Sequence, residues 1–366
     1  MRKILKNEGV QAFIASIICI LAGLLIGYIV LLCINPAGAG DSILNVIKNF
    51  FKSNSQKLQL KNLGNTLAKT MPLILCSLSI LFSYKVGLFN IGTAGQYVAG
   101  ACASLYAALA WGWGWLPCML FAVVAGALLG SITGLLKAYC NVNEVISGIM
   151  LNWIALYLTN TILTGVKEAA SPYTFYLNKQ NPGAILPTLG LEKLFSNNTY
   201  VTIALPLALI VAVIIWVILS KTKLGYELKA TGNNRNAAKY AGMAQNRNII
   251  LTLAISGALA GLGASLLYQS DYMRWECTQS SVPAMGFNGI AAAFLGGLHP
   301  IGAIFSSFFI QHITDGGTNV NTNFYSSQIS DVISSVIIYL CGFVLFIKLT
   351  MKRMLNKKGE TKGVTK

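Results

Sequence analysis

The chain alternates between long apolar runs and shorter polar segments. A helix that crosses a bilayer needs about 20 mostly apolar residues, and eight runs meet this requirement. They are residues 10–34, 62–83, 90–110, 116–136, 145–164, 199–220, 249–268 and 332–350. The pattern predicts an all-α integral membrane protein built as a polytopic bundle.

A further apolar stretch, residues 286–313, is interrupted by Gly296, Gly297 and Pro300. Proline interrupts a helix because it lacks a backbone N–H and its ring collides with the preceding turn. We therefore expect two short helices joined at residues 298–300, arranged as a hairpin or as two short spans. With this broken pair, the sequence predicts about 8–10 transmembrane helices.

Small residues recur at helical spacing in two of the runs. Gly126, Gly130 and Gly134 form a double GxxxG pattern, and Gly257 and Gly261 form another. Such positions let helix backbones approach closely in lipid. The pattern predicts a tightly packed bundle.

The composition agrees with a membrane protein. Of the 366 residues, 55% are hydrophobic and only 10% are charged. A soluble domain carries about 25% charged residues, because its surface faces water. The composition excludes a soluble enzyme, a nucleic-acid-binding domain and a disordered chain.

The net charge of +16 is distributed as expected for a membrane protein. In membrane proteins Lys and Arg concentrate in cytoplasmic loops. If the N-terminus of this chain is cytoplasmic, about two thirds of its Lys and Arg residues fall in cytoplasmic segments. We therefore expect both termini in the cytoplasm, a single transmembrane domain over residues 1–350, and a basic cytoplasmic tail over residues 351–366.

Familiar catalytic patterns are missing from the sequence. It has no G-x-x-x-x-G-K-[ST] phosphate loop, no HExxH and no paired-cysteine metal pattern. We expect no cofactor, metal site or catalytic residue. Asp315 and Asp331 lie at polar span ends, where capping or solvation explains them better than a protease pair. The nearly charge-free spans disfavour an ion-coupled secondary transporter, although that alternative stays open.

Uncharged amides dominate the polar residues of the membrane region. An amide offers both donors and acceptors, which suits a neutral polar solute with several hydrogen-bonding groups. Hydrogen bonding between helices is the alternative explanation. The residues concerned are Asn90, Gln96, Asn152, Asn160, Asn288 and Gln311.

The polar segment 221–248 has six positive charges and one Glu. Gly232 is expected to break the chain, and Asn233 or Asn234 to cap a helix of one or two turns over residues 236–241. Gly242 is expected to end that helix in the left-handed conformation.

Two functions suit this short helix. Ala237 and Ala238 would permit close docking onto a partner, with Tyr240 as an anchor. Alternatively, the segment is an ordinary basic loop that binds anionic lipid headgroups.

The stretch GYELKATGNNRNAAKYAGM, residues 225–243, resembles the coupling loop of bacterial ABC importer permeases of the branched-chain amino acid and simple-sugar class. The chain is most similar to the nucleoside-type permeases. Four further stretches resemble this family in the same order: 87–96, 141–155, 286–304 and 327–340. The resemblance covers roughly residues 60–350. Thr93 and Lys85 depart from the family, which often has an acidic residue and an Arg there.

The resemblance implies a permease subunit of an ATP-driven importer in a bacterial plasma membrane, not an enzyme. ATPase subunits would dock on the coupling loop, a second and different permease would complete the membrane part, and an extracellular lipoprotein would deliver the solute. The solute would be a nucleoside, with a simple sugar or a branched-chain amino acid as alternatives. No nucleic acid partner is expected.

The resemblance also implies roles for individual residues. The implied coupling residues are Gly232, Asn233, Ala237, Ala238, Tyr240 and Gly242. The residues implied near the solute path are Phe89, Asn90, Gln96, Asn152, Phe287 and Asn288.

Overall fold

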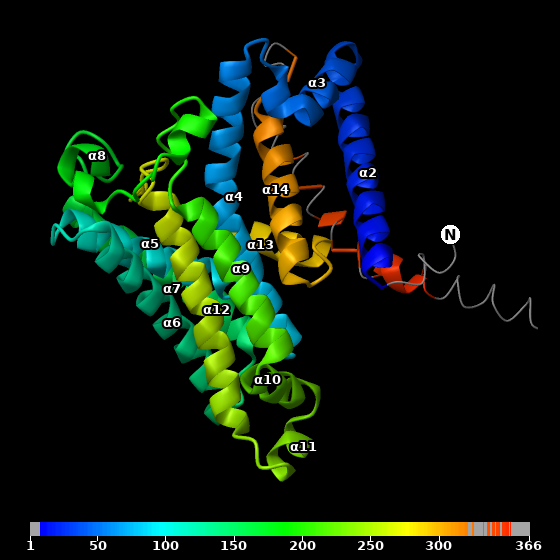
Figure 1. Ribbon diagram of the computed structural model, residues 1–366, viewed down its shortest axis with the longest axis vertical. Helices are drawn as coiled ribbons and strands as arrows, with labels where there is room; N and C mark the ends of the chain where they lie inside the picture. The colour runs from blue at the N-terminus through cyan, green and yellow to red at the C-terminus, as the bar shows by residue number, and fades with distance from the viewer. Residues whose placement is uncertain are drawn as a thin grey trace, which may run out of the picture. The chain divides into compact units, whose positions relative to one another are not determined.

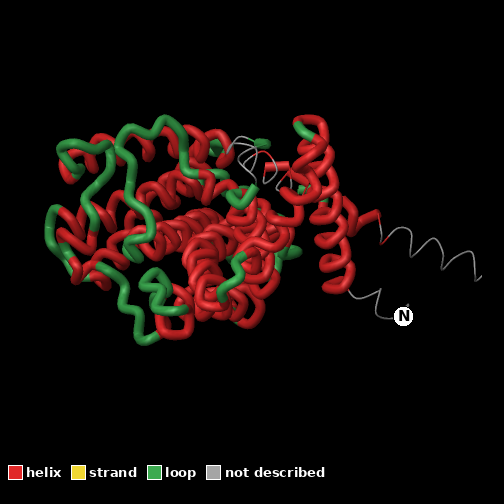
Figure 2. The backbone as a smooth tube through the Cα atoms, turned by 90° about the horizontal axis from the view of Figure 1, so that it is seen from above, coloured by secondary structure: helices red, strands yellow, loops and turns green. Residues whose placement is uncertain are grey.

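The computed structural model describes residues 8–320, 324–325, 332, 335–336, 339–340, 342–344, 346–350 and 352. The predicted span 332–350 is described only in part. Asp331 and the predicted tail, apart from residue 352, lie outside the described residues. The described chain is helices and connecting loops, with two isolated β-bridges and no strand (Figure 2). The all-α prediction is confirmed.

The chain divides into two compact units. The larger comprises Ser55–Ile290, and the smaller comprises Met1–Asn54 with Ala291–Lys366. The boundary falls inside helix α13 (Ala284–Leu295).

The larger unit is a helical bundle (Figure 1). Every span predicted within it coincides with a helix. The long helices are α4 (Gln56–Lys85), α5 (Thr93–Leu109), α6 (Trp115–Cys140), α7 (Glu144–Leu163), α9 (Ala204–Lys221) and α12 (Gln245–Tyr268). The short helices are α8 (Leu177–Gln180), α10 (Lys223–Asn233) and α11 (Arg235–Tyr240), beside 3₁₀ turns at Thr164–Val166, Pro182–Ala184 and Leu191–Phe195.

Helices α4 and α12 form the centre of the larger unit. In the most apolar stretch of each helix, 89% of the residues of α4 and 67% of those of α12 are buried inside the protein. The corresponding shares are 28% for α6 and for α9 and 33% for α7. Helix α12 packs on α4, α5 and α6, and α9 packs on α4 (Figure 1). The outer helices expose Leu, Ile and Val side chains, as expected of surfaces that face lipid.

The glycine patterns pack α6 directly against α12. A β-carbon at Gly126 would lie 2.2 Å from the carbonyl oxygen of Gly257, and one at Gly257 would lie 2.1 Å from that of Gly126. A β-carbon at Gly261 would lie 2.3 Å from the Ala122 oxygen. The two backbones are therefore in contact, which confirms the predicted tight packing.

The smaller unit contains α2 (Glu8–Ile34), α3 (Pro36–Lys48), a 3₁₀ turn (Asn49–Lys52), the end of α13 and α14 (Pro300–Gly317). The predicted break is confirmed, because α13 ends at Leu295 and Pro300 occupies the first turn of α14. Helix α14 packs on α3, where a β-carbon at Gly316 would lie 2.1 Å from the oxygen of Val46.

Six described helices are long and apolar enough to cross a membrane: α2, α4, α6, α7 with its 3₁₀ extension, α9 and α12. Helix α13 is apolar but shorter. The chain is a polytopic membrane protein, as predicted, and the cytoplasmic location of its termini stays a prediction.

Candidate functional site

A buried polar network lies where α4, α5 and α12 meet. Asn90 Nδ2 donates to Gln96 Oε1 at 2.8 Å and to Ser256 Oγ at 2.7 Å. Gln96 Nε2 donates back to Asn90 Oδ1 at 3.3 Å. Ser79 Oγ lies 2.8 Å from Ser256 Oγ and 3.1 Å from Thr93 Oγ1. All five side chains are buried, so the network joins the three helices without a charged group.

Asn152 makes a second polar link, from α7 to the start of α5. Its Oδ1 accepts the backbone N–H of Gly95 at 2.7 Å, and its Nδ2 donates to the carbonyl of Ile91 at 3.2 Å. Each side-chain nitrogen and oxygen of Asn90, Gln96 and Asn152 therefore has a protein partner. In this conformation the three amides hold helices together.

Helix α13 packs on the same region through two glycines. A β-carbon at Gly286 would lie 2.4 Å from the Cα of Ala94 on α5. One at Gly289 would lie 2.8 Å from the Cβ of Cys76 on α4. At these two glycines the backbone of α13 therefore packs directly against α4 and α5.

The other residues predicted near the solute path are less buried. Phe287 and Asn288 lie between the two packed glycines, and Phe287 is 40% exposed while Asn288 is half-buried. Phe89 is half-buried and meets the ring of Tyr84 edge-on, with ring centroids 6.4 Å apart. The structure thus gathers Asn90 and Gln96 in one network and places the two α13 residues partly outside the core.

The polar segment 221–248 folds into α10 and α11. Asn234 caps α11, its Oδ1 accepting the N–H of Ala237 at 3.0 Å, and Asn233 is the last residue of α10. Gly242 follows α11 with φ of 79°, the left-handed conformation that glycine adopts without strain. The predicted cap, short helix and glycine terminator are confirmed.

Gly232 does not break the chain as predicted. It lies in the last turn of α10, a helix that the sequence analysis did not anticipate. A β-carbon there would lie 2.0 Å from the carbonyl oxygen of Val86 and 2.9 Å from the backbone nitrogen of Gly87. Glycine is needed at 232 because α10 touches the backbone of the segment that leads into Asn90.

The two alanines of α11 differ in exposure. Ala238 is buried, whereas Ala237 and Lys239 are exposed and Tyr240 is 93% exposed. Helix α11 itself contacts α10 and α12. Ala238 thus packs α11 against the rest of the chain, whereas the side chain of Tyr240 is exposed to the surroundings.

At the opposite end of the larger unit, residues 165–202 and 269–283 form an ordered cap (Figure 1). Trp275 is fully buried, and its indole N–H donates to Asn160 Oδ1 at 2.9 Å. Arg274 lies over the rings of Tyr173 and Tyr176 and pairs with Glu168 at 3.1 Å. The cap joins α7 to the segment that follows α12.

Asp271 ties the short helix α8 into this cap. Its carboxylate accepts the backbone N–H groups of Leu177 at 3.1 Å and Asn178 at 3.3 Å. Burial raises the pKa of Asp271, and the two backbone donors oppose that shift. The sequence analysis did not assign these residues, because their partners are about a hundred positions apart.

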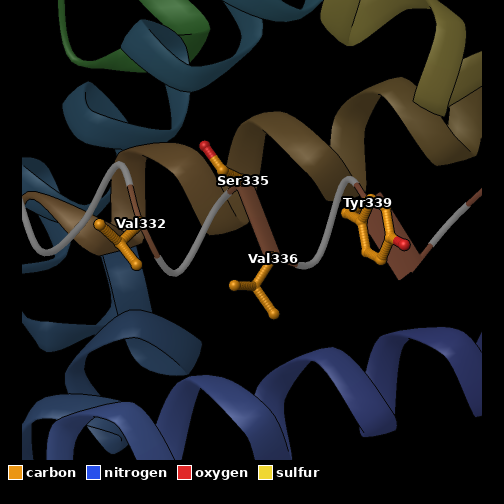
Figure 3. Close-up of a pocket in the computed structure, with 4 residues that line it drawn as sticks. All are labelled: Val332, Ser335, Val336 and Tyr339. Atoms are coloured by element: carbon orange, nitrogen blue, oxygen red, sulfur yellow. The ribbon is translucent and has the colours of Figure 1, made fainter.

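A cavity of about 380 Å³ lies in the smaller unit, and none of the predicted site residues is among those that line it (Figure 3). Val332, Ser335, Val336 and Tyr339 line it from one stretch of chain at helical spacing. Its lining brings together two hydroxyls and no charged side chain, so it carries no candidate chemistry.

The larger unit is thus a helical bundle with apolar outer surfaces, an uncharged polar centre and a pair of short helices at one end. The family described as the permease component of branched-chain amino acid transport systems matches residues 62–342. The chain belongs to this family.

Individual relatives extend the match over nearly the whole chain. The nucleoside ABC transporter permease NupB of Lactococcus lactis is 32% identical over 97% of this chain and 98% of its own length. The guanosine ABC transporter permease NupP of Bacillus subtilis is 34% identical over 81% of this chain and 85% of its own. The glucose ABC transporter permease TsgB13 of Haloferax volcanii is 28% identical over 95% of this chain and 92% of its own length. No solved structure matches the chain significantly.

The family and the fold together define what the chain is. It is a multi-pass permease of the bacterial plasma membrane, and it is a transport component rather than an enzyme.

Proposed function

We propose that this chain is the membrane subunit of an ATP-driven importer that carries a nucleoside. One observation carries the proposal: similarity to a nucleoside permease extends over 97% of the chain and 98% of that relative. The uncharged polar centre suits a neutral solute, because a carboxylate or ammonium group would need charged partners or free helix ends. The more distant glucose permease makes a simple sugar the alternative.

Helices α10 and α11 are the proposed docking site for the ATPase subunits, within a cytoplasmic coupling segment at residues 221–248. Two features support this role. Tyr240 is almost fully exposed at the end of a capped helix, and Ala238 holds that helix against the chain. In this arrangement Tyr240 and Ala237 meet the ATPase, while Asn233, Asn234 and Gly242 shape α11.

A continuous path of contacts leads from the coupling segment to the polar centre. Gly232 touches Val86 and Gly87, and the segment that follows contains Phe89 and Asn90. Asn248 at the start of α12 donates to Thr231 of α10 at 2.8 Å. A displacement of α11 would therefore reach both α12 and the Asn90 network through packed backbone rather than through flexible loops.

The proposed solute path runs beside α13. Phe287 is its most accessible predicted residue, with Asn288 half-buried beside it, and an aromatic ring next to an amide suits a nucleobase, by stacking and by edge hydrogen bonds. Phe89 flanks the path. Asn90, Gln96 and Asn152 position the helices around it through their hydrogen bonds.

Three partners complete the proposed importer: ATPase subunits, an extracellular lipoprotein that delivers solute, and a second permease of different sequence. A second guanosine permease of B. subtilis and a second nucleoside permease of L. lactis are also similar to this chain, which supports a hetero-pair. With both termini in the cytoplasm, the ordered cap would face the lipoprotein. Residues 1–350 would form the permease domain and residues 351–366 a cytoplasmic tail.

Uptake of radiolabelled solutes by cells tests the function. Cells that lack this chain should lose uptake of at least one nucleoside and regain it on complementation. Competition by unlabelled nucleosides, and not by glucose or leucine, is expected. Glucose uptake that depends on the chain would replace the nucleoside with a sugar. Uptake by this chain alone, driven by an ion gradient without ATPase subunits, would refute the importer.

A further inference from the structure

The hydroxyl of Tyr97 on α5 is an exception in a well-bonded core. The side chain is 1% exposed, and its oxygen has no hydrogen-bond partner. Within the described α-helices of the larger unit, it is the only buried side-chain oxygen or nitrogen in this condition. Buried polar groups are nearly always bonded, so an unbonded one requires an explanation.

The surroundings of Tyr97 are otherwise aromatic and apolar. Its ring lies 6.3 Å from that of Tyr268 on α12, and both rings belong to a core cluster that includes Cys76 of α4. Nothing in the packing requires a hydroxyl here. Phenylalanine would supply the same ring and remove an unpaired polar atom.

Tyr97 is placed next to the proposed solute path. Ala94, one turn earlier on the same face of α5, contacts Gly286 of α13, and Cys76 contacts Gly289. Helix α13, which carries Phe287 and Asn288, therefore packs on two residues that neighbour Tyr97. A separation of α13 from α4 and α5 would open this region.

The amides nearby cannot perform the same role without breaking existing bonds. Asn90 and Gln96 bond to each other, and Asn152 bonds to the backbone of α5 and the segment before it. Among the described α-helices of the larger unit, Tyr97 is the buried polar side chain that is still free to accept or donate.

We propose that the Tyr97 hydroxyl hydrogen-bonds the transported solute when α13 moves away from α4 and α5. This assignment rests on the proposed nucleoside import and adds a solute-binding residue to it. The phenol can pair with a hydroxyl of the sugar or with a nitrogen or carbonyl of the base.

The test compares Tyr97→Phe with the wild type in proteoliposomes that contain the complete importer. Nucleoside is supplied at a concentration that saturates the lipoprotein, so that permease binding limits transport. We expect nucleoside transported per ATP hydrolysed to fall about 5- to 10-fold, the loss of one hydrogen bond. The Tm of the purified complex should not fall, because the folded protein loses no bond.

Tyr325→Phe is the matched control. Its hydroxyl donates to the carbonyl of Asn35 at 2.5 Å, so its removal deletes a bond that the fold uses. This variant should lower the Tm and leave transport per ATP unchanged.

Two results would overturn the role of Tyr97. Unchanged transport per ATP in Tyr97→Phe would show that the solute does not use the hydroxyl. A Tm loss like that of Tyr325→Phe would show that the hydroxyl supports the fold. If the wild type carries no nucleoside, the proposed function fails and the role of Tyr97 fails with it, whereas wild-type transport with an unaffected variant refutes Tyr97 alone.

Discussion

Replacing Gly232 by alanine should uncouple ATP hydrolysis from transport. The new β-carbon would lie 2.0 Å from the Val86 oxygen and 2.3 Å from its carbonyl carbon, where ordinary contacts begin at 3.4 Å. Both atoms belong to backbone, so neither can rotate aside. Helix α10 must move from the segment that leads to Asn90 by about 1 Å or more, at a cost of about 1–3 kcal/mol.

The assay is parallel measurement of ATP hydrolysis and solute uptake by the complete importer in proteoliposomes. We expect ATP hydrolysis to continue, because α11 and its exposed Tyr240 are unchanged. Solute transported per ATP should fall about tenfold. This loss corresponds to about 1.4 kcal/mol, which lies inside the range of about 1–3 kcal/mol expected for the displacement of α10.

Gly165→Ala is the control for the Gly232 variant. A β-carbon at Gly165 meets nothing within 4 Å, so this variant should behave as the wild type. A Gly232→Ala importer with wild-type transport per ATP would show that the contact with Val86 does not transmit the motion, and the proposed path would be wrong.

Three further outcomes are expected. Gly257→Ala should lower the Tm of the purified chain far more than Gly165→Ala does, since its β-carbon would lie 2.1 Å from the Gly126 oxygen; equal Tm values would mean that α6 and α12 are not in contact. Tyr240→Ala should leave the chain in the membrane but reduce the amount of ATPase recovered with it, and full recovery would exclude Tyr240 as an anchor. In a variant without other cysteines, Lys239→Cys should react with an impermeant thiol reagent only after the cells are permeabilised, whereas labelling of intact cells would invert the topology.

The helices and their ends could be predicted to a large extent from the sequence. Apolar length alone located the long helices, and the glycine and proline at residues 297 and 300 located the break between α13 and α14. Asn234 and Gly242 marked the two ends of α11 because capping depends on neighbours within a few residues. These features depend on residues that are close in the sequence, and so they can be predicted from it.

Long-range contacts could not be predicted in the same way. Asn90 and Ser256 are 166 positions apart, and Trp275 and Asn160 are 115 apart. Gly232 looked like a helix breaker because glycine has low helix propensity. Its actual function is to let α10 touch Val86, and no neighbouring residue in the sequence indicates that contact.

The uncharged amides show why residue type alone left two explanations open. An amide that lines a path and one that joins helices are the same residue, and they differ only in how many of their atoms are already bonded. The side-chain amides of Asn90 and Gln96 hydrogen-bond to each other, and Asn90 also bonds to α12, so in this conformation they join helices. On the proposed path, a solute that enters beside α13 would meet Phe287 and Asn288 first, and the unbonded hydroxyl of Tyr97 only after α13 has moved. This order makes solute binding depend on the movement of a helix, as transport driven by a distant ATPase requires.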